Sequence, residues 1–299
     1  MSNTPLVTCC PAPTYTDFDL AARYLRFLLF DSILTCIYGL DVAVDRALRV
    51  LRHAWNDIPP GERPSFYDFT TTHTPVRSRL REYHQYRVVA PGAIPLFLPS
   101  CAFDAPFYRA TGLNAYESGY CAMDVTAVNS DYAKFIPSTL FIPYKTRSSA
   151  RCRQILERIN PIPLWFFGED GVLGFPVQGN TNSIKLLHGQ EALRLKSNDK
   201  PISTLKIKFA WPNYQPDEKQ IRATPNSPLN NLNTLASRTA GAVRTYMSDE
   251  TKKVMVNENL VPQPWKIGTQ PGEVRIADVL LLGVIFVSEG AAMPLLSVY

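Results

Sequence analysis

The chain lacks the signatures of several common catalytic classes. It has only four histidines, and none forms an HExxH pattern or lies near a cysteine pair, which excludes the common zinc signatures. There is no phosphate loop, because the glycines of Gly168–Gly174 surround the acidic pair Glu169-Asp170, which would repel a phosphate. The sequence therefore predicts no metal and no cofactor.

Targeting features are also scarce. Met1–Pro13 has no basic segment followed by an apolar core, as a secretory signal would. The apolar run Val279–Val287 is far shorter than the roughly 20 residues that cross a bilayer. The six cysteines have no framework spacing, and no Asn-x-Ser/Thr acceptor is present. We expect an intracellular protein, cytoplasmic or nuclear, without a membrane span.

The composition indicates a globular chain. With 299 residues and 45% hydrophobic content, it can form one large domain or two modest ones. Its 25 prolines favour extended segments and loop corners over a long helical bundle. The net charge of +5 permits contact with nucleic acid but does not require it.

The N-terminal part reads as helical. Thr16 and Asp19 form a capping-box pattern, and apolar residues surround a helix predicted over Leu20–Tyr38. Gly39 is expected to end or bend that helix, and Asp41 to cap the next one. The second helix has an apolar face and directs three arginines elsewhere, Arg46, Arg49 and Arg52.

A third helix is predicted further along the chain. Thr74-Pro75 favours a helix start, since proline suits the first helical position, and a short basic helix would cover Val76–Arg87. From Val88 to Pro99 the chain is apolar and rich in proline, which indicates extended segments.

The C-terminal part reads as strands with one helix. One hairpin is predicted from Leu164–Phe167 and Val172–Val177, and a second from Leu193–Lys196 and Leu205–Trp211. The last of these segments alternates apolar and charged residues, as a half-buried strand does. A helix follows over Leu232–Tyr246, and the closing strands include Val279–Val287 and Leu295–Val298.

These elements define the expected architecture. The early helices and late strands predict an α+β fold, with N-terminal helices packed on a strand-rich, mostly antiparallel C-terminal portion that carries one amphipathic helix. The expected division is a flexible tail over 1–15, a helical portion over 16–90 and a strand-rich portion over 91–299, with a single domain over 16–299 as the alternative.

Several motifs follow one another from about residue 160 to 299. They are Pro163–Phe167, Asp170-Gly171-x-Leu173-Gly174, Leu205–Tyr214, the helix Leu232–Tyr246, Trp265–Gly268, Asp278–Gly283, Val287-Ser288-x-Gly290 and Pro294–Leu296. Their order is similar to that in a protein family from mushroom-forming (basidiomycete) fungi. The family has no assigned activity, so the resemblance implies no catalytic residue, substrate or cofactor.

Two groups of residues are candidates for a function. The predicted basic helix mixes arginines with aromatic rings, as nucleic-acid surfaces do: Arg77, Arg79, Arg81, Arg87 and Tyr83. The alternative is a solvated helix face. Cys121 lies in a polar-aromatic segment and would need His84 or His188 as a base to act as a nucleophile, whereas a buried structural cysteine is more common.

The leading hypothesis is a non-enzymatic intracellular interaction or scaffold protein with a protein partner. It rests on the lack of paired catalytic residues, metal-ligand spacing and a cofactor loop. Three alternatives stay open: a nucleic-acid-binding protein that uses the helix near 77–87, a self-assembling coat-like protein, and an enzyme of unrecognised type.

Overall fold

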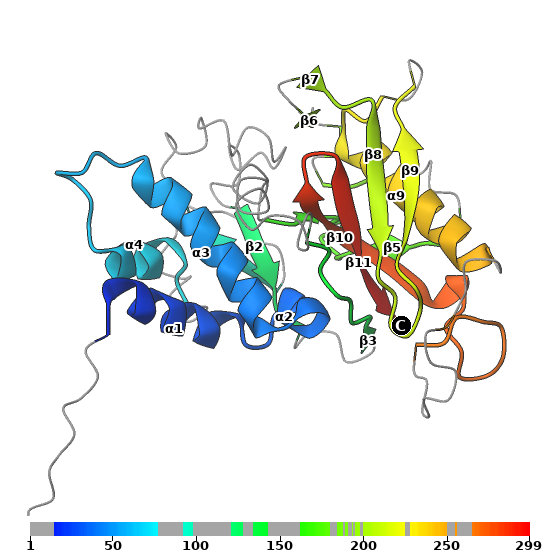
Figure 1. Ribbon diagram of the computed structural model, residues 1–299, viewed down its shortest axis with the longest axis horizontal. Helices are drawn as coiled ribbons and strands as arrows, with labels where there is room; N and C mark the ends of the chain where they lie inside the picture. Colours follow the sequence, from blue (N-terminus) through cyan, green and yellow to red (C-terminus); the bar gives the residue numbers. More distant parts are fainter. Residues whose placement is uncertain are drawn as a thin grey trace, which may run out of the picture.

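The described part of the molecule has a sheet between two unequal helical layers. The computed structural model describes residues 15–76, 92–97, 121–127, 134–142, 162–179, 184–187, 189–190, 193, 195–197, 200–224, 228–249, 255 and 265–299. The N-terminal helices lie to one side and share a core with the closing strands of the sheet, and a single long helix packs on the opposite face (Figure 1). The predicted α+β class, with mostly antiparallel strands in the C-terminal part, is confirmed.

The N-terminal layer contains α1 (Asp17–Leu29), α2 (Ile33–Tyr38), α3 (Leu40–Asn56) and α4 (Phe66–His73). The predicted capping box is confirmed, because the Thr16 side chain accepts from the Asp19 backbone and the Asp19 carboxylate accepts from the Thr16 backbone. Gly39 ends α2 at a φ of 90°, a conformation that favours glycine.

The prediction of one continuous helix over Leu20–Tyr38 is wrong. The helix ends at Leu29, and Ser32 starts α2 by accepting a hydrogen bond from the Thr35 backbone N–H at 3.3 Å. Ser32 also forms an antiparallel bridge with Thr126, so a contact from far along the chain fixes the break. An apolar pattern on all sides cannot reveal such a break.

Thr74 was expected to start a helix and instead ends one. Its backbone N–H donates to Thr70 O at 2.9 Å and closes α4, which begins at the capping residue Ser65. The rest of the predicted basic helix, residues 77–87, lies outside the described residues.

The main sheet runs in the order β4-β10-β11-β8-β9, with β3 added to β11 and β5 to β10. Its strands are β3 (Lys134–Phe135), β4 (Leu164–Trp165), β5 (Phe175–Pro176), β8 (Thr204–Phe209), β9 (Asp217–Arg222), β10 (Val279–Ser288) and β11 (Ala291–Val298). Two short antiparallel pairs lie apart from it: β1 (Ala93–Leu96) with β2 (Cys121–Val125), and β6 (Lys196–Ser197) with β7 (Lys200–Pro201). Among the strands of the described residues, only the β11–β8 pairing is parallel.

The central hairpin β10–β11 is buried on both faces. This explains its continuous apolar sequence, since one face of each strand packs on the N-terminal helices and the other on the opposite layer. Gly283 lets β4 approach β10 closely, because a Cβ at this position would lie 2.4 Å from the carbonyl oxygen of Leu164.

The second predicted hairpin has the wrong partner. Leu205, Ile207 and Phe209 are buried as predicted, but β8 pairs with β9 and not with Leu193–Lys196. The sequence of β9, DEKQIR, has almost no apolar alternation and gives no strand signal.

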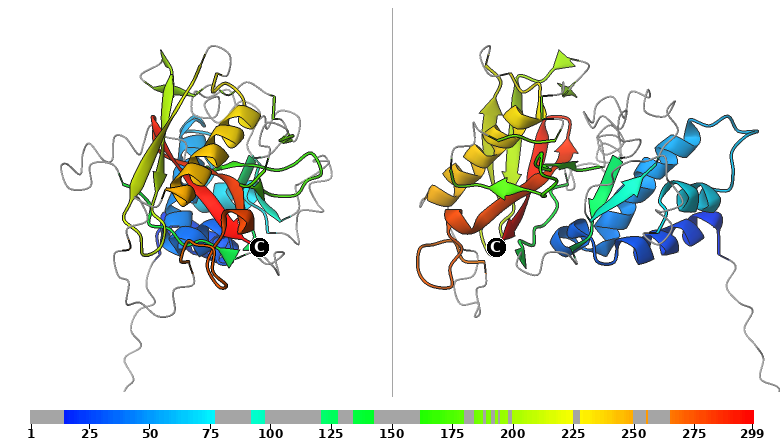
Figure 2. Two further views of the ribbon diagram at one scale, coloured as in Figure 1. Left: turned by 90° about the vertical axis from the view of Figure 1, so that its right-hand side faces the viewer. Right: turned by 180° about the vertical axis from the view of Figure 1, so that it is seen from behind.

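The opposite layer is formed by α9 (Leu232–Ser248), which confirms the predicted helix. Asn231 caps it, because its side chain accepts from the Thr234 backbone N–H at 2.8 Å. From behind, α9 lies across the sheet on the side away from the N-terminal helices (Figure 2). A short 3-10 helix, Ile276–Asp278, precedes β10.

Arg46 was predicted to point away from the apolar face of its helix and is instead buried. Only 5% of it is exposed, and its guanidinium donates to the carbonyl oxygen of Phe286 at 2.9 Å. This bond joins α3 to β10. None of the helices in the described ranges is long and apolar enough to cross a membrane.

Candidate anion-binding groove

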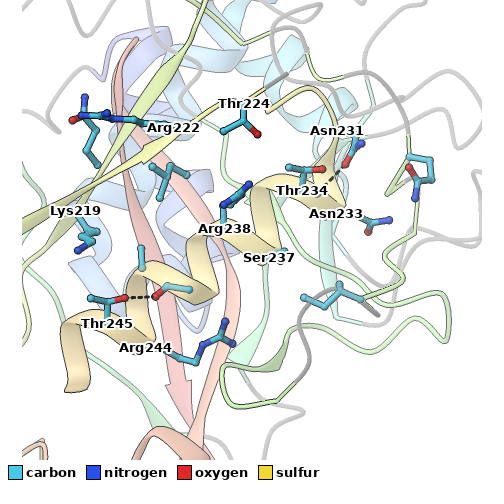
Figure 3. Close-up of a pocket in the computed structure, with 16 residues that line it drawn as sticks. Lys219, Arg222, Thr224, Asn231, Asn233, Thr234, Ser237, Arg238, Arg244 and Thr245 are labelled. Carbon is cyan, nitrogen blue, oxygen red and sulfur yellow. Dashed lines mark hydrogen bonds between the residues drawn. The ribbon is translucent and has the colours of Figure 1, made fainter. Parts of the chain in front are cut away.

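A groove of about 780 Å³ lies between β9 and α9 (Figure 3). Its lining residues are mostly polar or basic, and none of those described is acidic or aromatic: Ile184, Gln190, Lys219, Gln220, Ile221, Arg222, Thr224, Asn231, Asn233, Thr234, Ser237, Arg238, Gly241, Ala242, Arg244 and Thr245. The size is typical of ligand clefts, but the lining is far more polar than usual.

The groove runs along the edge of β9 and not over one face of it. Four consecutive residues of the strand line it, from Lys219 to Arg222, although successive side chains of a strand point to opposite faces. Ile221 is buried in the core under α9, so Lys219 shares that face. Gln220 and Arg222 belong to the other face and reach the groove at the strand edge.

That edge of β9 has no strand partner among the described residues, since β8 is the only strand paired with it. The Ala223 backbone N–H donates to Ser203 O at 2.7 Å, and this bond shows which residues of β9 direct their backbone groups toward β8. In an antiparallel pair the bonded and non-bonded positions alternate. The backbone N–H and C=O groups of Gln220 and Arg222 therefore point away from β8, into the groove.

The helix lines the groove with a stripe of side chains, and Asn233, Ser237, Gly241 and Arg244 beside that stripe also line it. Asn231, Thr234, Arg238 and Thr245 follow one another at helical spacing along the groove, as Figure 3 shows. The opposite side of α9 is held by its buried residues, which pack on the sheet: Leu232, Leu235, Ala236, Thr239, Ala240, Val243, Tyr246 and Met247. The stripe is consequently fixed on a rigid element.

The groove contains cations without acidic partners. The side chains of Lys219, Arg222 and Arg238 form no ion pair or hydrogen bond with any described residue, and all three are exposed. Arg244 differs, because its guanidinium donates to the carbonyl oxygens of Val177 at 2.7 Å and Gly179 at 3.3 Å. It positions that loop and adds a further positive charge.

On the face of β8 and β9 that points away from α9, by contrast, lysine side chains are paired with a carboxylate. Lys206 and Lys208 both pair with Glu218, and the hydrogen bonds from Lys206 and then Lys208 hold the pKa of that carboxyl below its usual value. The groove has no such carboxylate among the described residues. An incoming anion would supply it.

The sequence-predicted nucleic-acid residues are not tested by the structure. Arg77, Arg79, Arg81, Tyr83 and Arg87 all lie outside the described residues, so the basic helix stays a prediction. Sequence reasoning missed the β9–α9 groove because β9 itself was missed. The available signal was the spacing of Asn231, Thr234, Arg238 and Thr245 on the predicted helix.

Cys121 does not have the environment of a nucleophile. It lies in β2, is 2% exposed, and burial raises the pKa of its thiol to about 12. Reactive thiols need partial exposure and a lowered pKa. His188, one of its two suggested bases, lies outside the described residues, as does His84. No cluster of three or more potential metal ligands occurs in the described ranges.

Among the described residues, the strongly perturbed carboxyl is that of Asp124, which is buried under α2. Burial raises its pKa to about 7, against the opposing effect of hydrogen bonds from Ser32 and from the Val125 and Leu34 backbones. One of its oxygens, Oδ2, has no hydrogen-bond partner. It faces a cavity of only about 10 Å³ that Arg46 also lines, so no substrate reaches it.

Comparisons with known proteins found no relative of this chain. No protein-family model, no curated protein and no solved structure matches the chain. The resemblance to a basidiomycete family therefore stays a prediction from the motif order.

Proposed function

We propose that this protein is a non-enzymatic binding protein that holds an anionic ligand in the β9–α9 groove. The observation that carries the proposal is the set of three exposed cations, Lys219, Arg222 and Arg238, which line one groove without an ion pair in the described part of the chain. Guanidinium groups bind carboxylates and phosphates through two parallel hydrogen bonds, so both arginines suit such a ligand.

The polar side chains of the groove support the same ligand class. The hydroxyl groups of Thr224 and Thr234 and the amide of Gln190 line the groove as further hydrogen-bond donors. Because the cleft is open and its cations are solvated, we expect binding that weakens as salt is added. The expected intracellular location and a protein partner belong to the same proposal and rest on the sequence alone.

The test is a charge reversal in the groove. The double variant Arg222→Glu and Arg238→Glu should weaken binding of labelled polyglutamate or of a single-stranded oligonucleotide, whichever the unmodified protein binds, by at least about tenfold, because two attractions become repulsions. Affinity is measured by fluorescence anisotropy at two salt concentrations.

The matched control carries the same change in net charge elsewhere. Arg23→Glu with Arg52→Glu alters two exposed cations on α1 and α3, which interact with the rings of Tyr15 and Phe18. This pair should retain most of the affinity. If both double variants lose affinity equally, or if the unmodified protein binds neither probe, the groove is not the site and the proposal is wrong.

A further inference from the structure

We infer that the ligand of the groove is an extended acidic peptide segment of a partner protein, which adds to the free edge of β9 as a further strand. This inference rests on the proposed function and specifies its ligand. Its basis is that the groove presents backbone groups as well as cations, since the N–H and C=O groups of Gln220 and Arg222 point into it. Addition of a strand to an open edge is a common mode of peptide recognition.

The dimensions suit a single strand. β9 has six residues, and at about 3.3 Å per residue a partner segment of similar length would run along all of it. α9 packs on one face of the sheet near this edge and lines the same groove, so an added strand would lie beside β9 and along the flank of the helix (Figure 3).

The side chains of the groove select an acidic segment. On the α9 side, an added strand would meet Lys219 and Arg238, and on the other side Arg222. A segment in which acidic residues alternate with apolar ones can place all its acidic side chains on the α9 side, where they would meet Lys219 and Arg238.

The same lining disfavours a single-stranded nucleic acid. Sequence-tolerant binding of such strands uses aromatic rings on which the bases stack. The described lining residues include no tyrosine, phenylalanine, tryptophan or histidine. The cations would meet the phosphates, but nothing described in the groove would hold the bases.

The strand edge can be tested with one position of the protein. Gln220→Pro removes the N–H that points into the groove, places a ring against an incoming strand, and breaks no hydrogen bond to β8, since this N–H does not face β8. Gln220→Ala changes the side chain and keeps the backbone donor. The probe is a peptide of about ten residues that alternates glutamate and valine, and a lysine–valine peptide of equal length serves as the charge control.

We expect Gln220→Ala to bind the glutamate peptide within about twofold of the unmodified protein, and Gln220→Pro to bind at least about tenfold more weakly, which corresponds to one strong contact. The lysine peptide should not bind. As a measurement that needs no variant, the peptide should slow amide hydrogen exchange at Gln220 and Arg222 in the unmodified protein.

The outcomes separate this inference from the proposed function. If the glutamate peptide binds and depends on Arg238, but Gln220→Pro binds as well as Gln220→Ala and the two amides gain no protection, strand addition is wrong and an anion site remains. Binding of the oligonucleotide in place of the peptide overturns the inference in the same way. If no anionic probe binds, both proposals fail.

Discussion

Charged residues have opposite environments on the two sides of the central sheet. On the side of the N-terminal helices, Arg46 and Asp124 are buried and hydrogen-bonded to backbone groups. On the α9 side, Lys219 and Arg238 are exposed and have no partner in the described part of the chain, and Arg222, likewise exposed and unpaired there, reaches the same groove at the edge of β9. The first arrangement holds layers together, whereas the second leaves charge available to a ligand.

This difference assigns separate roles to the two sides. A buried ionised group is costly unless it is hydrogen-bonded, so removing its bonds should change stability. Exposed cations contribute little to stability, so removing them should change binding alone. Each expected effect below tests whether stability and binding are divided between the two sides in this way.

The largest loss of stability is expected at Arg46. Arg46→Ala should lower the free energy of unfolding by about 3 kcal/mol, because it leaves the Phe286 carbonyl without its donor and opens a cavity between α3 and β10. Urea unfolding measures the change. The neighbouring variant Arg49→Ala loses only a surface pair with Asp45 and should change stability by less than about 0.5 kcal/mol. Equal effects of the two variants would contradict the buried role of Arg46.

The next effect depends on pH and concerns Asp124. Its pKa is raised from 3.8 to about 7, so between these pH values the folded protein keeps a proton that the unfolded chain has lost. The folded state binds more protons in this range, and Asp124 therefore lowers stability as the pH rises, by on the order of 1 kcal/mol per pH unit.

Asp124→Asn removes this titration and keeps an oxygen that accepts from the Leu34 and Val125 backbones. The variant should gain stability relative to the unmodified protein from about pH 4 to pH 7, and then keep a constant difference. Denaturation at several pH values measures it. A difference that stays flat over this range would show that Asp124 is ionised in the folded protein.

A smaller loss of stability is expected when one helix cap is removed on either side of the sheet, and the two losses should be equal. Asn231→Ala and Thr16→Ala each remove a side-chain acceptor for the first turn of a helix, α9 and α1, and should each cost about 1 kcal/mol. Thermal unfolding compares the two. Only Asn231→Ala should also alter ligand affinity, since Asn231 lines the groove. If Thr16→Ala weakened binding by as much, the two sides would not be independent.

The sequence predicted those elements whose residues carry the signal themselves. The capping box at Thr16, the strand β8, the helix α9, the strand β10 and the second half of β11 each have a recognisable local sequence pattern. The prediction that Arg46 points away from the apolar face was wrong, because the sequence of a helix does not show that a distant strand will provide a carbonyl acceptor.

The groove could not be predicted because it depends on β9. An edge strand needs little apolar alternation, and β9 exposes four of its six side chains. Its register with β8, and hence the direction of the Gln220 and Arg222 backbone groups, is set by pairing across the sheet. The helix stripe was visible, but its significance required the position of the strand beside it.

The smallest effect on stability is expected at the centre of the groove. Arg238→Ala removes an exposed side chain without an ion pair in the described residues, so the free energy of unfolding should change by less than about 0.5 kcal/mol. Its affinity for the glutamate–valine peptide should nevertheless fall, and the dependence of affinity on salt should become less steep, because one attractive charge is lost. Urea unfolding and fluorescence anisotropy on the same sample separate the two quantities. A large loss of stability would instead make Arg238 a structural residue and would remove the contrast with Arg46.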